Sequence, residues 1–378
     1  MPNSFQKTPK NFQVFHSFFN TLTDPRRTDR GKFFYPLEEI LFLTIAAVIS
    51  GADNWTSISK FGQTKLSWLR KYYPYQQGTP SHDILGDLFA RLDDKVFSQC
   101  FTDWVSSIAT HTEGDIVAID GKTICNSTDR STNKSALHVV SAYASENRLC
   151  LGQKIVNQKS NEITAIPELL ELLELKGCII TIDAMGCQKK IAQEIIKKDA
   201  DYLLMVKDNQ KELKKQVEKM FARGCVAQTD TQFDVGHGRA ETRTCDVIDD
   251  LRFMDEREQW KGLKSIIRVQ SERYDKQTQR TSHQARYYIS SMDADAKKAN
   301  SAVRKHWSIE NNLHWVLDVI FKEDASLKKK GNSAVNYNII LKLALAMIDS
   351  EKSRKISKPI KRLNAAWDDD YRAKILNC

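Results

Sequence analysis

Paired cysteines, long apolar runs and internal repeats are all missing from this chain, and each absence removes a class of protein. Its eight cysteines include no C-x-x-C pair and no other paired ligand spacing, so neither a zinc ribbon nor a dithiol redox site is predicted. The most apolar stretch, 40–49, is about half as long as a membrane span requires. We therefore expect a protein of the reducing cytosol, without a signal segment or a membrane partner.

Charge, in contrast, is abundant. The 378 residues include 57 lysines and arginines against 48 acidic residues, which gives a formal net charge of +9. An excess of this sign favours an anionic polymer over a neutral metabolite as the partner, although many soluble proteins with other functions share it. The length fits two or three domains.

The residue patterns divide the chain into an all-helical start, an alternating middle and a helical end. Helical periodicity runs from 37 to about 108, and short apolar runs and helices then alternate as β-β-β-α-β-α-β-α between 115 and 221. Residues 223–290 contain short β-type runs separated by polar turns, which predicts a β-rich insertion. A helix is expected from about 296 to 322, followed by an apolar helix to about 348 and a basic tail.

Two acids each follow a short apolar run. Asp120 closes the run 115–119, and Asp183 closes the run 178–182. Continuous apolar runs of this length are typical of strands buried on both faces, and an acid at the polar end of such a strand does not fill core. If the two strands are neighbours, their carboxylates repel each other unless cations lie between them. This arrangement predicts a Mg²⁺ site.

Six short sequence motifs support that interpretation and make it more specific. They are AIDGKT at 118–123, KSNEITAIP at 159–167, DAMGCQ at 183–188, KDNQ at 207–210, HGRAE at 237–241 and HWSIENNLHW at 306–315. Together with the element order, they resemble the ribonuclease-H-like core of DDE transposases, and in particular the insertion-sequence transposases that include H-repeat-associated proteins found beside Rhs elements. The resemblance spans roughly residues 20–325.

This resemblance implies a fold, an activity and partners. The fold would be α/β, a ribonuclease-H-like mixed sheet with a β-rich insertion, preceded by an all-α domain. Asp120, Asp183 and Glu310 would be the catalytic acids and metal ligands, holding Mg²⁺, for which Mn²⁺ can substitute. Double-stranded DNA at the inverted repeats of the element and target DNA would be the partners, bound by a homo-oligomer in the cytoplasm at the nucleoid.

The third acid is less certain from the residues alone, because most helical glutamates are solvated. Glu310 shares a predicted helix face with Val303, Trp307, His314, Leu317 and Phe321, which a solvated glutamate would not normally do. Asp318 is the alternative acid. Many related transposases carry tyrosine, arginine and lysine around this glutamate, whereas Val303, His306 and Leu317 occupy those positions here.

Several cations and aromatic residues are weaker candidates for DNA contacts, and a solvated or core position is the alternative for each. The candidates for phosphate contacts are Lys122, Lys207, His237, Arg239, Arg243, His306 and His314. Trp307 or Trp315 could stack on an extruded base, but a tryptophan at helical spacing is usually core. The basic tail, 352–362, either follows the DNA backbone or is a soluble end.

These observations predict a DNA transposase that cleaves element ends and transfers the 3′-hydroxyl strand by two-metal chemistry. The expected parts are a helical DNA-binding domain at 1–112, a catalytic core at 113–222 and 291–325, an insertion at 223–290 and a basic helical extension at 326–378. The alternatives are a related nuclease that no longer transposes and a DNA-binding regulator whose site has decayed. A carboxylate-pair glycosidase would need neither metal nor basic surface.

Overall fold

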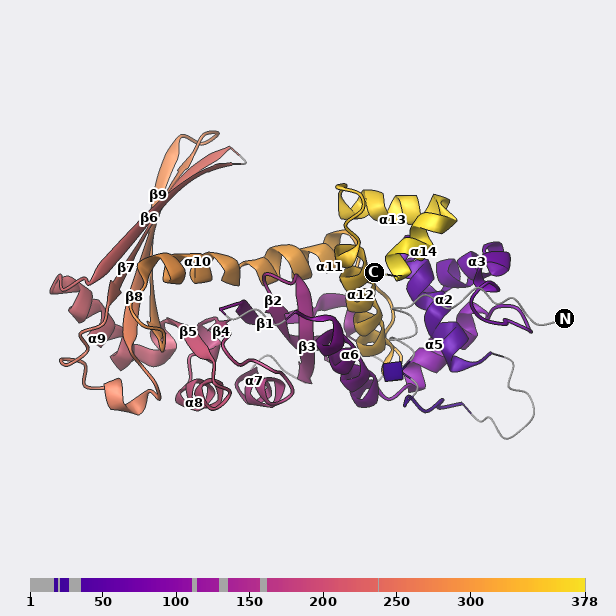
Figure 1. Cartoon of the computed structure of the whole chain (residues 1–378), viewed down its shortest axis with the longest axis horizontal. Coiled ribbons are helices and arrows are strands. Elements are labelled where there is room, and N and C mark those ends of the chain that lie inside the picture. Colours follow the sequence, from indigo (N-terminus) through magenta and orange to yellow (C-terminus); the bar gives the residue numbers. More distant parts are fainter. Residues whose placement is uncertain are drawn as a thin grey trace.

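The computed structural model describes residues 17–19, 21–26, 35–110, 114–128, 135–156, 162–236 and 238–377. A nine-stranded sheet occupies the middle and one end of the elongated molecule, and helices from both ends of the chain gather at the other end (Figure 1). Among the described residues, no helix is long and apolar enough to cross a membrane.

The first five strands form the centre of the molecule. They are β1 (Ile116–Ile124), β2 (Leu137–Ala144), β3 (Leu149–Val156), β4 (Ile179–Ile182) and β5 (Asp201–Val206). Their spatial order is β3-β2-β1-β4-β5; β1 runs antiparallel to β2 and parallel to β4, and β5 runs parallel to β4. This is the predicted ribonuclease-H-like mixed sheet. Its strands and helices follow one another along the chain in the predicted order, β-β-β-α-β-α-β-α.

Helices cover both faces of this sheet because its central strands are apolar on both faces. One face packs against α7 (Glu162–Glu171), α8 (Lys189–Lys197) and α9 (Lys211–Ala222). The opposite face packs against α10 (Ala296–His306) through residues such as Ile179 and Leu203. Asp120, in the middle of β1, and Asp183, directly after β4, are therefore carried by a sheet that is covered on both faces.

The predicted β-rich insertion is present, and it extends the same sheet. Its strands are β6 (Gln228–Gly236), β7 (Arg239–Ile248), β8 (Ser265–Asp275) and β9 (Arg280–Ser290). Strand β9 pairs antiparallel with β5, and β8, β7 and β6 follow outwards. The distal halves of these strands project as an arm beyond the body of the molecule (Figure 1).

The helices from the two ends of the chain share one hydrophobic core. The first group comprises α2 (Leu37–Ile49), α3 (Trp55–Thr64), α4 (Leu66–Leu69), α5 (His82–Arg91) and α6 (Asp94–Ile108). The second group comprises α12 (Ser333–Ser350), α13 (Lys358–Trp367) and α14 (Asp369–Leu376). Helix α12 is buried along almost its whole length and packs against α2, α5 and α6. The two segments are thus structurally interdependent.

The basic tail is solvated only in part: Lys352, Arg354 and Lys355 are exposed, but two of its cations are buried, and for those two neither expected role holds. Lys361 and Arg362 are each 7% exposed and donate hydrogen bonds to backbone carbonyl groups, Lys361 to Ile348 and Arg362 to Val48. Burying these two charged groups costs little free energy because carbonyl oxygens near the ends of apolar helices accept their hydrogen bonds. These two cations therefore cannot follow a DNA backbone.

The predicted continuous helix from 296 to 322 is interrupted. After α10, residues Glu310–His314 form a π-helical turn, η6, which leads into α11 (Trp315–Val319). A π-turn contains an extra residue and shifts the phase of the side chains beyond it, and such turns are frequent at functional sites. The face expected for this helix is also split before the π-turn, because α10 ends at His306: Trp307, the next residue, is exposed, whereas His314 and Leu317 are buried.

Candidate active site

The strands that precede Asp120 and Asp183 are neighbours, which is the condition under which the sequence pattern predicts that the two carboxylates are close. Parallel pairing aligns Ile119 of β1 with Ile182 of β4, so each acid is the residue that follows an aligned pair. Asp120 still belongs to β1, whereas Asp183 comes directly after β4. The carboxyl ends of parallel strands meet at one sheet edge, which is where ligand sites form in open α/β sheets.

The backbone after β4 fixes the orientation of Asp183. Its Oδ1 accepts hydrogen bonds from the amides of Met185 at 3.0 Å and Gly186 at 3.4 Å and so caps a short 3-10 turn. A Cβ at Gly186 would lie 2.2 Å from the Ile182 side chain. The DAMG word therefore specifies a tight turn that holds the second acid.

Glu310 reaches the same site from the π-turn, together with His314. The His314 Nδ1 lies 3.2 Å from Oε2 of Glu310 and 3.7 Å from Oδ2 of Asp120. Ligand atoms of these three residues all lie within 4.8 Å of one another, a spacing that could hold a metal ion. His314 is 4% exposed, and its Nε2 is buried without a hydrogen-bond partner. The imidazole thus has one nitrogen, Nδ1, beside the two acids and a second, Nε2, that no hydrogen bond satisfies, and a bound cation could use an imidazole nitrogen as a ligand.

The electrostatics of Asp120 fit a crowded anionic site. Burial raises the pKa of Asp120 to about 6, and the nearby charges of Asp183 and Glu162 act in the same direction, while His314 opposes the shift. The hydrogen bond from His314 lowers the pKa of Glu310, whose side chain is 55% exposed. The site therefore favours bound cations or protons on Asp120, as expected where carboxylates converge.

Sequence comparison places the whole chain. The family description "Transposase DDE domain" matches residues 111–347, and "DDE_Tnp_1-associated" matches residues 16–105. The chain belongs to the DDE-domain transposase family. The first region includes all three acids, and the second includes the N-terminal helices.

Two relatives from Escherichia coli agree with that assignment. A putative transposase YncI from Escherichia coli O157:H7 is 42% identical over 95% of this chain and 93% of its own length. The H repeat-associated putative transposase YhhI from Escherichia coli K12 is 40% identical over 90% and 92%. A solved piggyBac transposase synaptic complex with hairpin DNA is 14% identical with a TM-score of 0.46, covering 100% of this chain and 84% of that one.

Asp318, the alternative third acid, forms contacts away from Asp120. Asp318 forms an ion pair with Lys122, which also lies 2.9 Å from Oε2 of Glu323. Neither Asp318 nor Lys122 faces solvent freely: their side chains are 30% and 13% exposed. The geometry thus brings Glu310, and not Asp318, to Asp120, and it places Lys122 in ion pairs.

The remaining cationic candidates lie in different settings. Lys207 is exposed directly after β5 and lines a cavity of about 400 Å³ with Arg286 and Trp307. Arg239 is exposed near Asp275, whereas Arg243 is buried between Asp234 and Glu241. His237 lies outside the described residues.

His306 supports the second acid from beneath. Its Nδ1 is 3.0 Å from the hydroxyl of Thr181, two residues before Asp183, and the side chain is buried. Burial lowers the pKa of His306 to about 4, although the Asp183 charge acts against that shift. A neutral, buried imidazole can support the site through hydrogen bonds. At neutral pH it has no positive charge with which to bind a phosphate.

Trp307 and Trp315 are not core residues, contrary to the expectation from helical spacing. They are 41% and 52% exposed, on either side of the π-turn. The Arg286 guanidinium lies 5.1 Å from the Trp307 ring, within cation–π range. Their indole rings are therefore open to solvent close to Glu310 in the sequence, one before and one after the π-turn.

Sequence reasoning missed one group beside the site. Buried Glu162, at the start of α7, lies 2.6 Å from Nε2 of His138, and His138 Nδ1 lies 2.8 Å from the Thr123 hydroxyl. A Cβ at Gly121 would be 2.5 Å from Oε1 of Glu162. The signal was present, because Gly121 and Glu162 both occur in the quoted words, but their proximity depends on the fold.

Proposed function

We propose that this chain is a DNA transposase that cleaves the ends of its insertion element and joins the freed 3′-hydroxyl strand to target DNA. The observation that supports the proposal is the approach of Glu310 and His314 from the π-turn to Asp120, with Asp183 directly after the strand that pairs with β1. The family match covers the region that supplies these residues. No nucleophilic side chain is required for this chemistry.

Asp120, Asp183 and Glu310 would hold divalent cations, with His314 as a further donor to the Asp120–Glu310 side. Carboxylate oxygens are the ligands that Mg²⁺ and Mn²⁺ prefer, and an imidazole nitrogen suits Mn²⁺ better than Mg²⁺. When bound, such ions activate the attacking hydroxyl and stabilise the leaving oxygen. The protein's own contribution is to orient the acids, Asp183 through its turn amides and Glu310 through His314.

DNA would lie over the exposed surface around the acids. Trp307 and Trp315 flank Glu310 on that surface, and Lys207 and Arg286 border the adjacent cavity. The projecting arm, with Arg239 near its end, would contact DNA beyond the cut. These cations are candidates for phosphate contacts, which fix register without reading sequence.

We further propose that the segments 1–112, 113–222 with 291–325, 223–290 and 326–378 act as end-binding, catalytic, insertion and supporting parts. In the first part, Lys60 and Lys71 are exposed and could contact phosphates, whereas Arg27, Arg30 and Lys32 lie outside the described residues. Because the first and last parts share a core, end recognition should be tested in the full chain. Joining two DNA ends would require a homo-oligomer.

The deciding experiment incubates the full-length protein with a plasmid that carries the native flanks of its gene, in Mg²⁺, Mn²⁺ or EDTA. Specific nicks that leave 3′-hydroxyl ends at the flanks, abolished by EDTA, are expected. Asp120→Asn, Asp183→Asn and Glu310→Gln should each lower cleavage by several orders of magnitude and keep DNA affinity. Asp293→Asn, at an 89% exposed acid, is the matched control.

A second arm separates transposition from simple cleavage. Pre-cut ends and a supercoiled target plasmid are supplied together, and joined products are sequenced. Joined products with a constant target spacing support strand transfer. Cleavage without joining would identify a nuclease, and metal-independent flank binding without cleavage would identify a regulator.

A further inference from the structure

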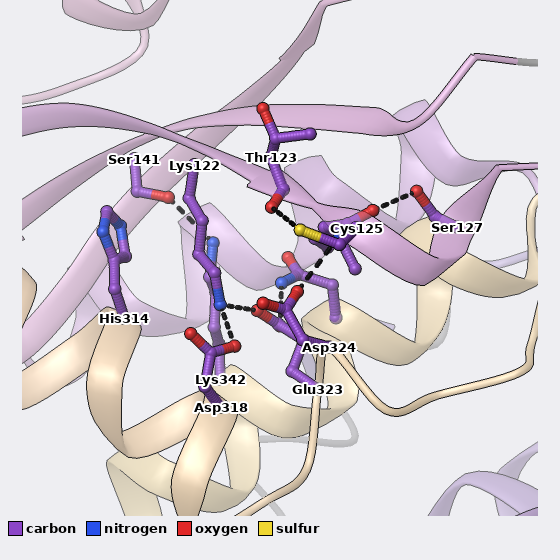
Figure 2. Close-up of polar contacts among 12 residues, drawn as sticks. Lys122, Thr123, Cys125, Ser127, Ser141, His314, Asp318, Glu323, Asp324 and Lys342 are labelled. Atoms are coloured by element: carbon purple, nitrogen blue, oxygen red, sulfur yellow. Dashed lines mark hydrogen bonds and ion pairs between the residues drawn. The ribbon is translucent and has the colours of Figure 1, made fainter.

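Lys122 connects the strand that carries Asp120 to the segment that carries Glu310. It lies two residues beyond Asp120 on β1, and side chains two apart on a strand point to the same face. Its Nζ forms an ion pair with Asp318 and lies 2.9 Å from Oε2 of Glu323 (Figure 2). With Glu323 only 3% exposed, the contact is shielded from water and from salt.

The acidic partners follow the π-turn directly. Asp318 lies in α11, one helical turn after His314, and Glu323 comes after that helix. The π-turn interrupts the regular helical hydrogen bonds at Glu310–His314, so regular helix geometry alone does not set the phase of these two side chains. An anchor just beyond the turn is needed to fix them, and Lys122 supplies it from β1.

Helix α12 holds Glu323 from a second side. Glu323 accepts a hydrogen bond from Asn338 at 2.6 Å. One turn later on α12, buried Lys342 donates to the Ser141 hydroxyl at 2.9 Å. Ser141 is the β2 residue paired with Asp120. Two separate polar contacts therefore connect α12, one to the segment after α11 and one to β2; Figure 2 shows the second, between Lys342 and Ser141.

A third connection joins the residues directly after β1 to the segment after α11. The backbone amide of Cys125 donates to Oδ1 of Asp324 at 3.1 Å, and the Asn126 side chain donates to the Asp324 carbonyl at 2.6 Å. Lys122 and two residues that follow it in the chain are thus all attached to the segment after the π-turn. Such supporting contacts typically hold metal-binding groups in place.

We propose that Lys122 is a positioning residue: by pairing with Asp318 and Glu323, it sets the separation between Asp120 on one side and Glu310 with His314 on the other. It acts through these partners and does not itself contact DNA. The effect of Lys122 on catalysis rests on the proposed function. The geometry that Lys122 fixes, however, is that of the side chains that would bind metal. It can therefore be measured without any DNA.

The test measures Mn²⁺ binding to the DNA-free full-length protein by calorimetry and by the electron paramagnetic resonance of free Mn²⁺. Lys122→Met keeps the aliphatic stem and removes the charge, Lys122→Arg keeps the charge, and Lys264→Met, at a 55% exposed lysine, is the control. We expect Lys122→Met to weaken Mn²⁺ binding by about tenfold or more. Lys122→Arg should recover most of that loss, and the control should bind as the wild type does.

Asp318→Asn provides an independent variant if Lys122→Met fails to fold, because it leaves the Lys122–Glu323 pair intact. It should weaken Mn²⁺ binding in the same direction, and the double variant Lys122→Met/Asp318→Asn should lose little more than Lys122→Met alone. Wild-type Mn²⁺ affinity in folded Lys122→Met or Asp318→Asn would overturn the proposal. So would a loss of DNA affinity with metal affinity unchanged, which would make Lys122 a phosphate contact.

A cleavage assay separates this inference from the proposed function. If Lys122 positions the acids, Lys122→Met should require more Mg²⁺ for half-maximal cleavage and recover activity at high Mg²⁺. If the wild type cleaves nothing, the proposed function fails, yet the Mn²⁺ titration still decides the role of Lys122.

Discussion

The imidazole Nδ1 of His314 lies 3.7 Å from Oδ2 of Asp120. The same nitrogen is 3.2 Å from Oε2 of Glu310, so a single buried side chain links an acid on β1 to an acid in the π-turn. The sequence suggested His314 as a phosphate contact, but at 4% exposure it faces the acids instead. Its role is therefore tied to the geometry and cation preference of the site.

Replacing His314 should change which metal works. A nitrogen donor favours Mn²⁺ over Mg²⁺, whereas carboxylate oxygens suit both. In His314→Gln we expect Mn²⁺ affinity to fall by roughly tenfold and Mg²⁺ affinity to fall less. Parallel calorimetric titrations with the two ions measure this, and an equal loss for both would show that His314 only orients Glu310.

Metal affinity should depend on pH through Asp120. Burial, with the charges of Asp183 and Glu162, raises the pKa of Asp120 from 3.8 to about 6, so below that pH a proton competes with the cation for the carboxylate. Affinity for Mn²⁺ should fall by about tenfold per pH unit below pH 6 and level off above it. Titrations from pH 5 to 8 test this, with Asp120→Asn as the variant that lacks the dependence.

The raised pKa of Asp120 should also make the stability of the metal-free protein depend on pH, and in the opposite direction to metal affinity. Because the folded state holds the Asp120 proton more tightly than the unfolded chain does, the metal-free protein should lose stability as pH rises through about 6. Thermal unfolding with a chelator present, compared with Asp120→Asn, checks the direction. Saturating Mn²⁺ should remove the loss.

The strands and the first two acids could be predicted because burial leaves a local signature. The apolar runs that end at Asp120 and Asp183 were sufficient to place both acids at one sheet edge. The π-turn at Glu310–His314 leaves no such signature. A regular helical period also placed Trp307 in the core, because it did not predict that α10 ends at His306.

The partners of Lys122 and Gly121 were beyond prediction for a different reason. Asp318, Glu323 and Glu162 contact β1 only after distant segments pack together, and one sequence carries no record of such pairings. A lysine close to a catalytic acid consequently resembled a phosphate contact. The shared core of the N-terminal and C-terminal helices was hidden in the same way.

Gly121 should be intolerant of any side chain. A Cβ there would approach Oε1 of Glu162 at 2.5 Å and Nε2 of His138 at 2.6 Å, whereas a Cβ at Gly236 would meet nothing within 4 Å. Both positions are in strands. Gly121→Ala should cost about 1–3 kcal/mol of unfolding free energy, and Gly236→Ala should be near neutral. Denaturant unfolding of the two variants compares them, and equal stabilities would contradict the close approach.

The last helix should be essential to the fold of the helical end. Ile375 in α14 is completely buried, whereas Ile360 in α13 is 45% exposed. Ile375→Ala should lower the free energy of unfolding by about 2–5 kcal/mol, while Ile360→Ala should change it little. Chemical denaturation measures both. A similar small effect at both sites would mean that α14 is peripheral to the core.

The two arginines of the arm should separate into a DNA contact and a structural ion pair. Arg239 has a 66% exposed side chain and lies 3.4 Å from Asp275, while Arg243 is 9% exposed and lies 3.5 Å from Glu241 and 3.7 Å from Asp234. Arg239→Ala should reduce cleavage of paired ends more than binding of a single end and leave the thermal midpoint unchanged. Arg243→Ala should instead destabilise the β6–β7 hairpin, by about 1–3 kcal/mol.

Thermal unfolding and a paired-end cleavage assay on both variants distinguish these roles. Exposed arginine contacts add affinity only when DNA is present, whereas removing Arg243 leaves Asp234 and Glu241 without one of their cations even in the free protein. Lys276→Ala, in the turn between β8 and β9, tests whether any cation at the arm end suffices. Wild-type cleavage in Arg239→Ala would show that the arm only braces the sheet, and an unchanged midpoint in Arg243→Ala would remove its structural role.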